Sequence, residues 1–129
     1  MNDDGEIRNV VARLAQWADA GDLDDYVDLF TPDARWDMPG APRHGHADIR
    51  AGAEARRAAG ETGPGSNTRH VVTTTAVTVE GDDAIADSYW LFYRDTASAP
   101  CLQSMGSYRD HLVRVDGGWT VARREIVIG

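Results

Sequence analysis

The chain has 129 residues, of which 42% are hydrophobic and 26% charged, as expected for one soluble globular domain covering residues 1–129. A formal net charge of −8 argues against nucleic acid as a partner and favours a small substrate that is neutral or held by one local cation. No apolar run is long enough to span a membrane, the acidic start is unlike a secretory signal, and the lone Cys101 favours a reducing cytoplasm.

Three helices are predicted in the first half of the chain. In the first of them apolar residues recur at spacings of three and four, which is typical of a helix with one buried face, and the third is rich in Ala and Arg and ends at Gly60. Asp22 is expected to cap the second helix, which is short. The adjacent Arg56 and Arg57 are expected on the solvent face of the third. The predicted helices cover residues 5–20, 22–30 and 46–60.

Five segments read as strands, and four of them follow one another after residue 68. They are rich in β-branched and aromatic residues, and the breaks "EGDD" and "DGG" predict hairpins. Trp36 and Met38 share one side of the first strand. Gly106 is expected to mark a bulge that helps the sheet bend. The predicted strands are residues 33–38, 69–79, 84–95, 101–115 and 119–128.

This order of elements predicts an α+β fold. Helices that come first and a meander of strands that follows give three helices packed on one face of a strongly curved, mainly antiparallel sheet. A sheet bent in this way leaves a cone-shaped cavity beneath the helices, where a small molecule could bind.

The alternation of side chains along each strand limits which residues face that cavity. The alternation alone does not show which face of the sheet is the inner one. One of the two possibilities groups aromatic and aliphatic side chains with a few polar groups, which is the composition of a small-molecule pocket. On that choice Val71 and Thr73 face outward. The predicted inner face carries His70, Val72, Thr74, Tyr89, Leu91, Tyr93, Tyr108, Asp110 and Arg124.

The first helix can add a carboxylate to this group. Asp19 lies four residues after Ala15 and seven after Ala12, so the three residues share one stripe beside the buried face. Alanines leave room, and the wall of a cavity needs room.

Three motifs in this order resemble the SnoaL-like branch of the NTF2-like superfamily, over about residues 6–127. They are "WADAGDLDDYVDLFTPDARWDMPG", "TRHVVTTTAVTVEGDDAIADSYW" and "GSYRDHLVRVDGGWTVARREI". Within it the chain is most similar to lyases of the scytalone dehydratase, hexachlorocyclohexane dehydrochlorinase and bile acid 7α-dehydratase type. The resemblance implies the NTF2-like cone, with the three helices packed on the curved sheet.

The resemblance also implies site residues. The Asp–His dyad of these lyases corresponds here to Asp19 and His70, and the arginine that follows the "DG.W" motif corresponds to Arg124. In the polyketide cyclases of the superfamily an acidic residue acts from a late strand, which corresponds to Asp110. Trp36, Met38 and the inward residues of the later strands are expected to bind a small hydrophobic or polycyclic substrate.

The expected chemistry is proton abstraction by His70, held in one tautomer by Asp19, followed by β-elimination as in a dehydratase. This reaction requires no metal or organic cofactor. One alternative is a polyketide cyclase or steroid-isomerase-like enzyme that uses Asp110. Another is a ligand-binding or assembly domain without catalysis.

Two further expectations concern the surface. His44 and His46 suggest a metal site, but two histidines need a third ligand and a rigid frame, so no metal is expected. The outer face of the sheet is expected to form a homodimer or homotrimer, as in other members of the superfamily. The apolar residues expected there are Val71, Trp90, Phe92 and Val113.

Overall fold

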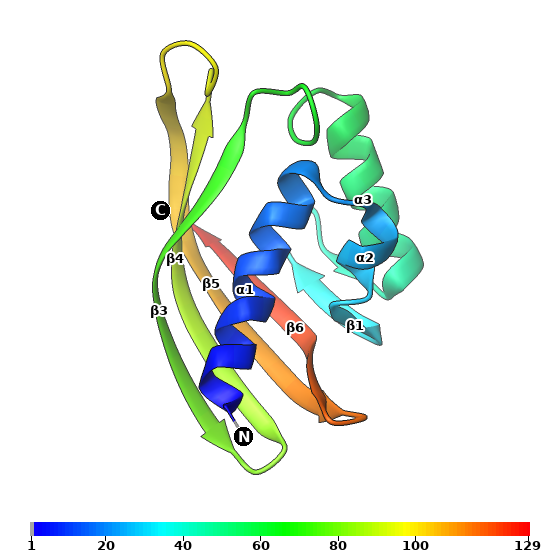
Figure 1. The fold of residues 1–129 in the computed structure, drawn as a ribbon. Helices are drawn as coiled ribbons and strands as arrows, with labels where there is room; N and C mark the ends of the chain where they lie inside the picture. Colours follow the sequence, from blue (N-terminus) through cyan, green and yellow to red (C-terminus); the bar gives the residue numbers. More distant parts are fainter. Residues whose placement is uncertain (1) are drawn as a thin grey trace.

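Three helices lie on one face of a six-stranded sheet in the computed structural model, which describes residues 2–129 (Figure 1). The helices are α1 (Asp3–Ala20), α2 (Leu23–Val27) and α3 (His46–Ala58). The strands are β1 (Phe30–Asp37), β2 (Arg43–His44), β3 (Arg69–Glu80), β4 (Asp83–Arg94), β5 (Cys101–Val115) and β6 (Gly118–Ile128). The predicted α+β class is confirmed.

The sheet has the order β2-β1-β6-β5-β4-β3. Strands β3 to β6 form the predicted antiparallel meander, and β1 pairs with β6 in parallel, so the sheet is mixed. The long strands curve around α1, and β2 and β3 remain as two open edges (Figure 1). The parallel pairing brings β1, with Trp36, beside Arg124 of β6.

Local signals in the sequence set the ends of the first two helices. The Asn2 side chain accepts a hydrogen bond from the Gly5 amide at 3.0 Å and so caps α1. Asp22 caps α2 as predicted, because its Oδ1 accepts from the Asp24 amide at 2.7 Å. α2 ends at Val27, earlier than expected, because the chain turns there to begin β1. Among residues 2–129 no helix has both the length and the apolar character needed to cross a membrane.

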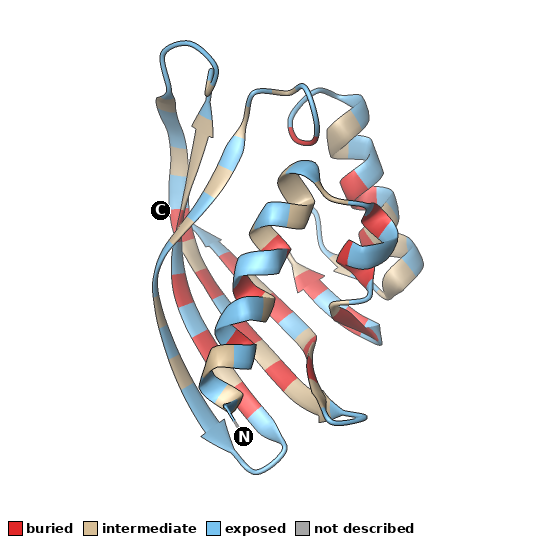
Figure 2. Cartoon of the chain, viewed as in Figure 1, coloured by how far each residue is buried: buried red, intermediate tan, exposed pale blue. Residues whose placement is uncertain are grey.

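The hydrophobic core lies between α1 and the sheet, with α2 and α3 closing it over β1. Buried residues recur at every second position along β4 and β5 beneath α1, and along β6 with one extra residue between Val121 and Arg124 (Figure 2). This alternation is what one buried face of a sheet requires. The most deeply buried apolar residues are Ile7, Leu14, Phe30, Ala34, Ala86, Leu112 and Val121.

Strand β3 contains an irregularity that changes which residues face inward. Its pairing with β4 shifts between Val72 and Thr75. Val72 is partly buried against the core, as predicted, whereas Thr73 and Thr74 are both exposed. The predicted inward orientation of Thr74 is therefore wrong, because the bulge reverses the alternation after Thr73.

Gly106 does not mark a bulge, because it pairs regularly with Trp90 on one side and Ile128 on the other. A Cβ atom at this position would lie 1.9 Å from the Val127 carbonyl oxygen and 2.7 Å from the Trp90 ring. Glycine is therefore needed for close approach of the neighbouring strand and of the Trp90 ring.

Candidate active site

A cavity of about 520 Å³ lies on the face of the sheet that carries the helices. Its walls come from the inner faces of β1 and β3 to β6, from the end of α3 and from the loop that follows α3. A smaller pocket of about 50 Å³ adjoins it beneath α1, where Ala15 and Ala18 leave room. Six residues line both parts: Trp36, Arg56, Thr62, His70, Tyr108 and Ile126.

Asp19 and His70 are in direct contact at this cavity. The ring Nδ1 of His70 lies 2.7 Å from Asp19 Oδ1, and the His70 amide donates to Asp19 Oδ2 at 2.9 Å. Both side chains are mostly buried, with exposed fractions of 11% for Asp19 and 20% for His70. The predicted pairing of these two residues is therefore confirmed as a contact, and their catalytic role stays a prediction.

This contact determines which ring nitrogen of His70 can act. A carboxylate accepts, so Nδ1 carries the proton in the neutral ring and Nε2 is left as the base. Among residues 2–129 no group bonds Nε2, and the ring lines both parts of the cavity. The Phe92 ring packs against the imidazole, with 4.6 Å between centroids. The arrangement suits proton transfer to or from a bound molecule.

Arg57 stabilises the end of the helix that carries Asp19. Its guanidinium donates to the carbonyl oxygens of Trp17 at 2.9 Å, Ala18 at 3.3 Å and Gly21 at 2.8 Å. The last carbonyls of a helix are unsatisfied and carry partial negative charge, which a cation offsets. The predicted solvent-facing position of Arg57 is therefore wrong.

Arg56 is also wrongly predicted to face solvent, because it is half-buried and lines the cavity. Its guanidinium lies 4.6 Å from the centroid of the Trp36 ring, in a cation–π contact. Helical spacing could have revealed this position, since Arg56 lies seven residues after Ile49 and three after Ala53, both buried.

Tyr108 contributes a buried hydroxyl-bearing ring to the cavity wall. The ring stacks on Trp90 at 5.8 Å, and the Arg124 guanidinium lies 3.8 Å from its centroid. Burial raises the pKa of Tyr108 to about 12, although the nearby Arg124 opposes the shift. The hydroxyl is therefore a neutral donor at physiological pH.

Asp110 and Arg124 form a bidentate ion pair across β5 and β6. Arg124 Nε donates to Oδ1 at 2.7 Å, and Nη2 donates to Oδ2 at 2.9 Å. The Asp110 side chain is 0% exposed and does not line the cavity, whereas Arg124 lines the smaller pocket. Burial alone would lower the pKa of Arg124, but the Asp110 carboxylate raises it above its usual value. Both Asp110 oxygens are occupied, so the pair is a structural link.

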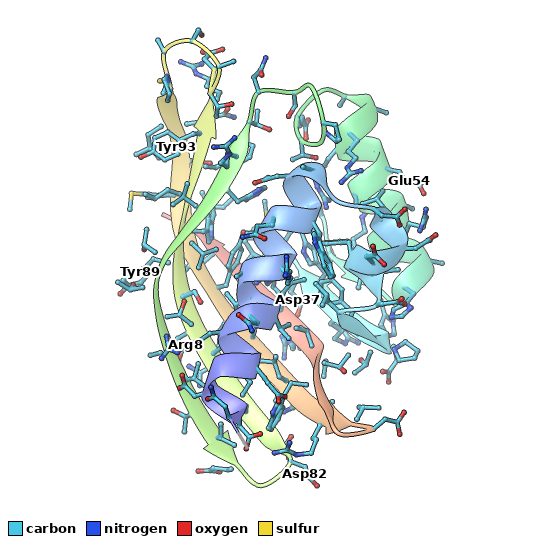
Figure 3. All side chains as sticks on the ribbon, viewed as in Figure 1. Arg8, Asp37, Glu54, Asp82, Tyr89 and Tyr93 are labelled. Carbon is cyan, nitrogen blue, oxygen red and sulfur yellow. The ribbon has the colours of Figure 1, made fainter. Side chains whose placement is uncertain are left out.

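Tyr89, Leu91 and Tyr93 do not face the cavity, which contradicts their predicted orientation. Tyr89 is 61% exposed, and its side chain and that of Tyr93 point away from the helices (Figure 3). The register explains this result, because His70 pairs directly with Phe92 and Val72 with Trp90. Residues directly opposite in paired strands share a face, so Trp90 and Phe92 line the cavity instead of forming the outer face.

The remaining predicted residues lie as follows. Trp36 and Met38 both line the cavity, as expected of substrate-binding candidates. His46 begins α3, and its Nε2 lies 2.7 Å from the Phe30 carbonyl oxygen. Within residues 2–129 no group of three or more His, Cys, Asp and Glu side chains is arranged to hold a metal ion.

Solved structures with the same fold come from several bacteria. An NTF2-like protein with a cystatin-like fold from Novosphingobium aromaticivorans has 29% identity and a TM-score of 0.86, covering 98% of this chain and 82% of that one. ActVI-ORFA from Streptomyces coelicolor has 25% identity and a TM-score of 0.81, covering 97% and 96%. A candidate scytalone dehydratase from N. aromaticivorans DSM 12444 has 19% identity and a TM-score of 0.78, covering 98% and 83%, and shows likeness of fold alone.

A search of curated protein sequences finds no match to this chain. The family description that matches is the SnoaL-like domain, over residues 1–125. This match includes Asp19, His70 and the residues that line the cavity, except Ile126. The chain belongs to the family of SnoaL-like domains.

Proposed function

We propose that the protein is a lyase of the dehydratase type, in which His70 abstracts a proton from a small, largely apolar substrate. The observation that carries this proposal is the contact between Asp19 and the His70 ring, which leaves Nε2 without a partner in residues 2–129, beside an aromatic-walled cavity. Asp19 acts through His70 by fixing its tautomer and stabilising the imidazolium.

The proposed reaction begins at the carbon next to a carbonyl group. Nε2 of His70 takes the proton, and the C–H electrons form an enolate. The Tyr108 hydroxyl donates to the enolate oxygen, which is favourable because the Tyr108 side chain is buried and its hydroxyl stays protonated. The enolate then re-forms the carbonyl and expels a β-hydroxyl group, which takes the proton back from His70 and leaves as water. Positioned proton transfer of this kind contributes about 10²–10⁴-fold in rate.

A second candidate reaction uses the same Asp19–His70 dyad but gives a different product. If the substrate carries a β,γ-double bond in place of the leaving group, the enolate is conjugated, the proton returns to the γ-carbon and the reaction is an isomerisation of the double bond. A mechanism that uses Asp110 as the acid or base has less support, because both of its carboxylate oxygens are bonded to Arg124.

Turnover of aryl β-hydroxy ketones, combined with deuterium exchange at the α-carbon in D₂O, tests the proposal. We expect exchange in the wild-type protein and loss of about 10²-fold or more in Asp19→Asn and His70→Gln. The matched control is Asp28→Asn, an exposed aspartate outside the cavity that should keep wild-type rates. Exchange that persists in His70→Gln contradicts the dyad, and ligand binding without any exchange favours a binding domain.

A further inference from the structure

Arg56 is an arginine in the wall of the cavity whose charge has no partner among the residues that the structure describes. Among residues 2–129 no hydrogen bond or ion pair joins its guanidinium to another group, and it stacks on the Trp36 ring. We infer that Arg56 binds a carboxylate on the substrate, so that the cavity takes an aromatic or polycyclic carboxylic acid. This inference deepens the proposed function and rests on the same cavity being the substrate site.

The other arginines show how unusual this is. The chain carries 13 basic residues against 21 acidic ones, so carboxylate partners are plentiful. Arg57 bonds three carbonyl oxygens, and Arg35 and Arg69 are exposed to water. The arginines in ion pairs are Arg8, Arg43, Arg50, Arg94, Arg109, Arg114, Arg123 and Arg124.

The surroundings of Arg56 explain why an anion would bind there. Burial lowers the pKa of the guanidinium, so its charge is poorly solvated and gains from a negative partner. The stack on Trp36 holds the group at the wall, and a guanidinium presents N–H groups in a fork that matches a carboxylate. Glu61 at the cavity rim attracts Arg56 over a distance but forms no ion pair with it.

The rest of the cavity indicates what the remainder of the substrate is, an aromatic or polycyclic body. Trp36, Trp90, Phe92 and Tyr108 form aromatic walls, and a volume of about 520 Å³ lies within the usual range for small-molecule sites. The net charge of −8 provides no general attraction for an anion, so recognition of a carboxylate would depend on this local cation.

Calorimetric titration with 2-naphthoate and its neutral isostere 2-naphthamide tests the inference. We expect the wild-type protein to bind the carboxylate about tenfold more tightly or better, and Arg56→Gln to lose that preference. Arg56→Lys keeps the charge without the fork and should keep part of the preference. The control is Arg13→Gln, because Arg13 also stacks on a tryptophan, Trp17, but lies outside the cavity.

Each outcome is decisive and separable from the proposed reaction. The inference is overturned if the wild-type protein binds the two compounds with equal affinity or binds neither. It is also overturned if the preference for the carboxylate survives in Arg56→Gln. His70→Gln should keep the carboxylate preference while it loses proton exchange. Full exchange in His70→Gln with the preference intact would therefore overturn the proposed function and leave the role of Arg56 standing.

Discussion

The carboxylate of Asp19 holds His70 at two points, one oxygen on the ring Nδ1 and the other on the main-chain amide of the same residue. The ring is therefore fixed relative to its own backbone, and the end of α1 is joined to the start of β3. A single bond to the ring would leave the imidazole free to turn about its side-chain torsions.

The first prediction concerns the tautomer of His70. Because Asp19 accepts from Nδ1, the neutral ring should carry its proton there and leave Nε2 unprotonated. Long-range ¹H–¹⁵N correlation spectra should show this form in the wild-type protein, and Asp19→Asn should change the tautomer ratio. A wild-type ring protonated mainly at Nε2 would contradict the proposed base.

The second prediction concerns the buried pair of Asp110 and Arg124. Asp110→Asn or Arg124→Met leaves one buried group without its partner, so each should lower the free energy of unfolding by about 3–5 kcal/mol. Urea denaturation measures this loss. The Asp37→Asn variant breaks a more exposed pair with Arg123 and should cost about 1 kcal/mol or less. A stable Asp110→Asn protein that has lost only its activity would favour a catalytic Asp110.

The third prediction concerns close packing at Gly106. Gly106→Ala would place a methyl group 1.9 Å from the Val127 carbonyl oxygen, so we expect a loss of about 4 kcal/mol or more, or failure to fold. The control is Gly118→Ala, where the nearest atom outside the adjacent residues is the Val115 carbonyl oxygen at an ordinary 3.8 Å. Equal melting temperatures for the two variants would show that the strands can separate at little cost.

The fourth prediction concerns stability at alkaline pH. The pKa of Tyr108 is raised from its ordinary value of 10.0 to about 12, so the folded protein holds this proton more tightly than the unfolded chain. The resulting stabilisation is complete below pH 10 and is lost as the pH rises toward about 12. Tyr108→Phe removes the ionisable group. Between pH 10 and pH 12 the free energy of unfolding of this variant should therefore fall by roughly 2–3 kcal/mol less than that of the wild-type protein. If urea denaturation shows that the free energies of unfolding of the two proteins fall in parallel with rising pH, Tyr108 makes no such contribution.

The fifth prediction concerns the outer face of the sheet. A hollow of about 550 Å³ lies there, and its lining includes the exposed Tyr89 and Val127. Met105 is also exposed and belongs to β5 between their strands. We propose that this face forms the expected homodimer or homotrimer, and Tyr89→Asp with Val127→Asp should then give monomers in sedimentation analysis. A wild-type protein that is monomeric at micromolar concentration would contradict the proposal.

The sequence predicts much of the fold for identifiable reasons. Helical spacing predicted α1, a composition rich in Ala and Arg predicted α3, and the turns around Gly81 and Gly117 predicted the two hairpins. The parallel pairing of β1 with β6 was missed, because it joins segments far apart in the chain and leaves no local pattern.

The candidate site was predicted less completely. The pairing of Asp19 with His70 follows from the family resemblance, whereas the placement of Tyr89 failed because parity within one strand says nothing about its register with the next. Arg56 was missed because adjacent arginines suggest a solvated face, although only one of them faces the cavity and the other caps α1.

The bulge in β3 divides that strand into two halves of opposite phase. His70 and Val77 are an odd number of residues apart, yet both turn toward the helices, because Thr73 and Thr74 are consecutive outward residues. Deleting either threonine would remove the bulge and restore strict alternation with both halves in phase, because Thr73 and Thr74 together stand opposite the single residue Tyr89. The extra residue is therefore not needed to aim the imidazole at the cavity; what it supplies is the local bend and added twist with which the edge strand β3 follows the curve of the sheet around α1.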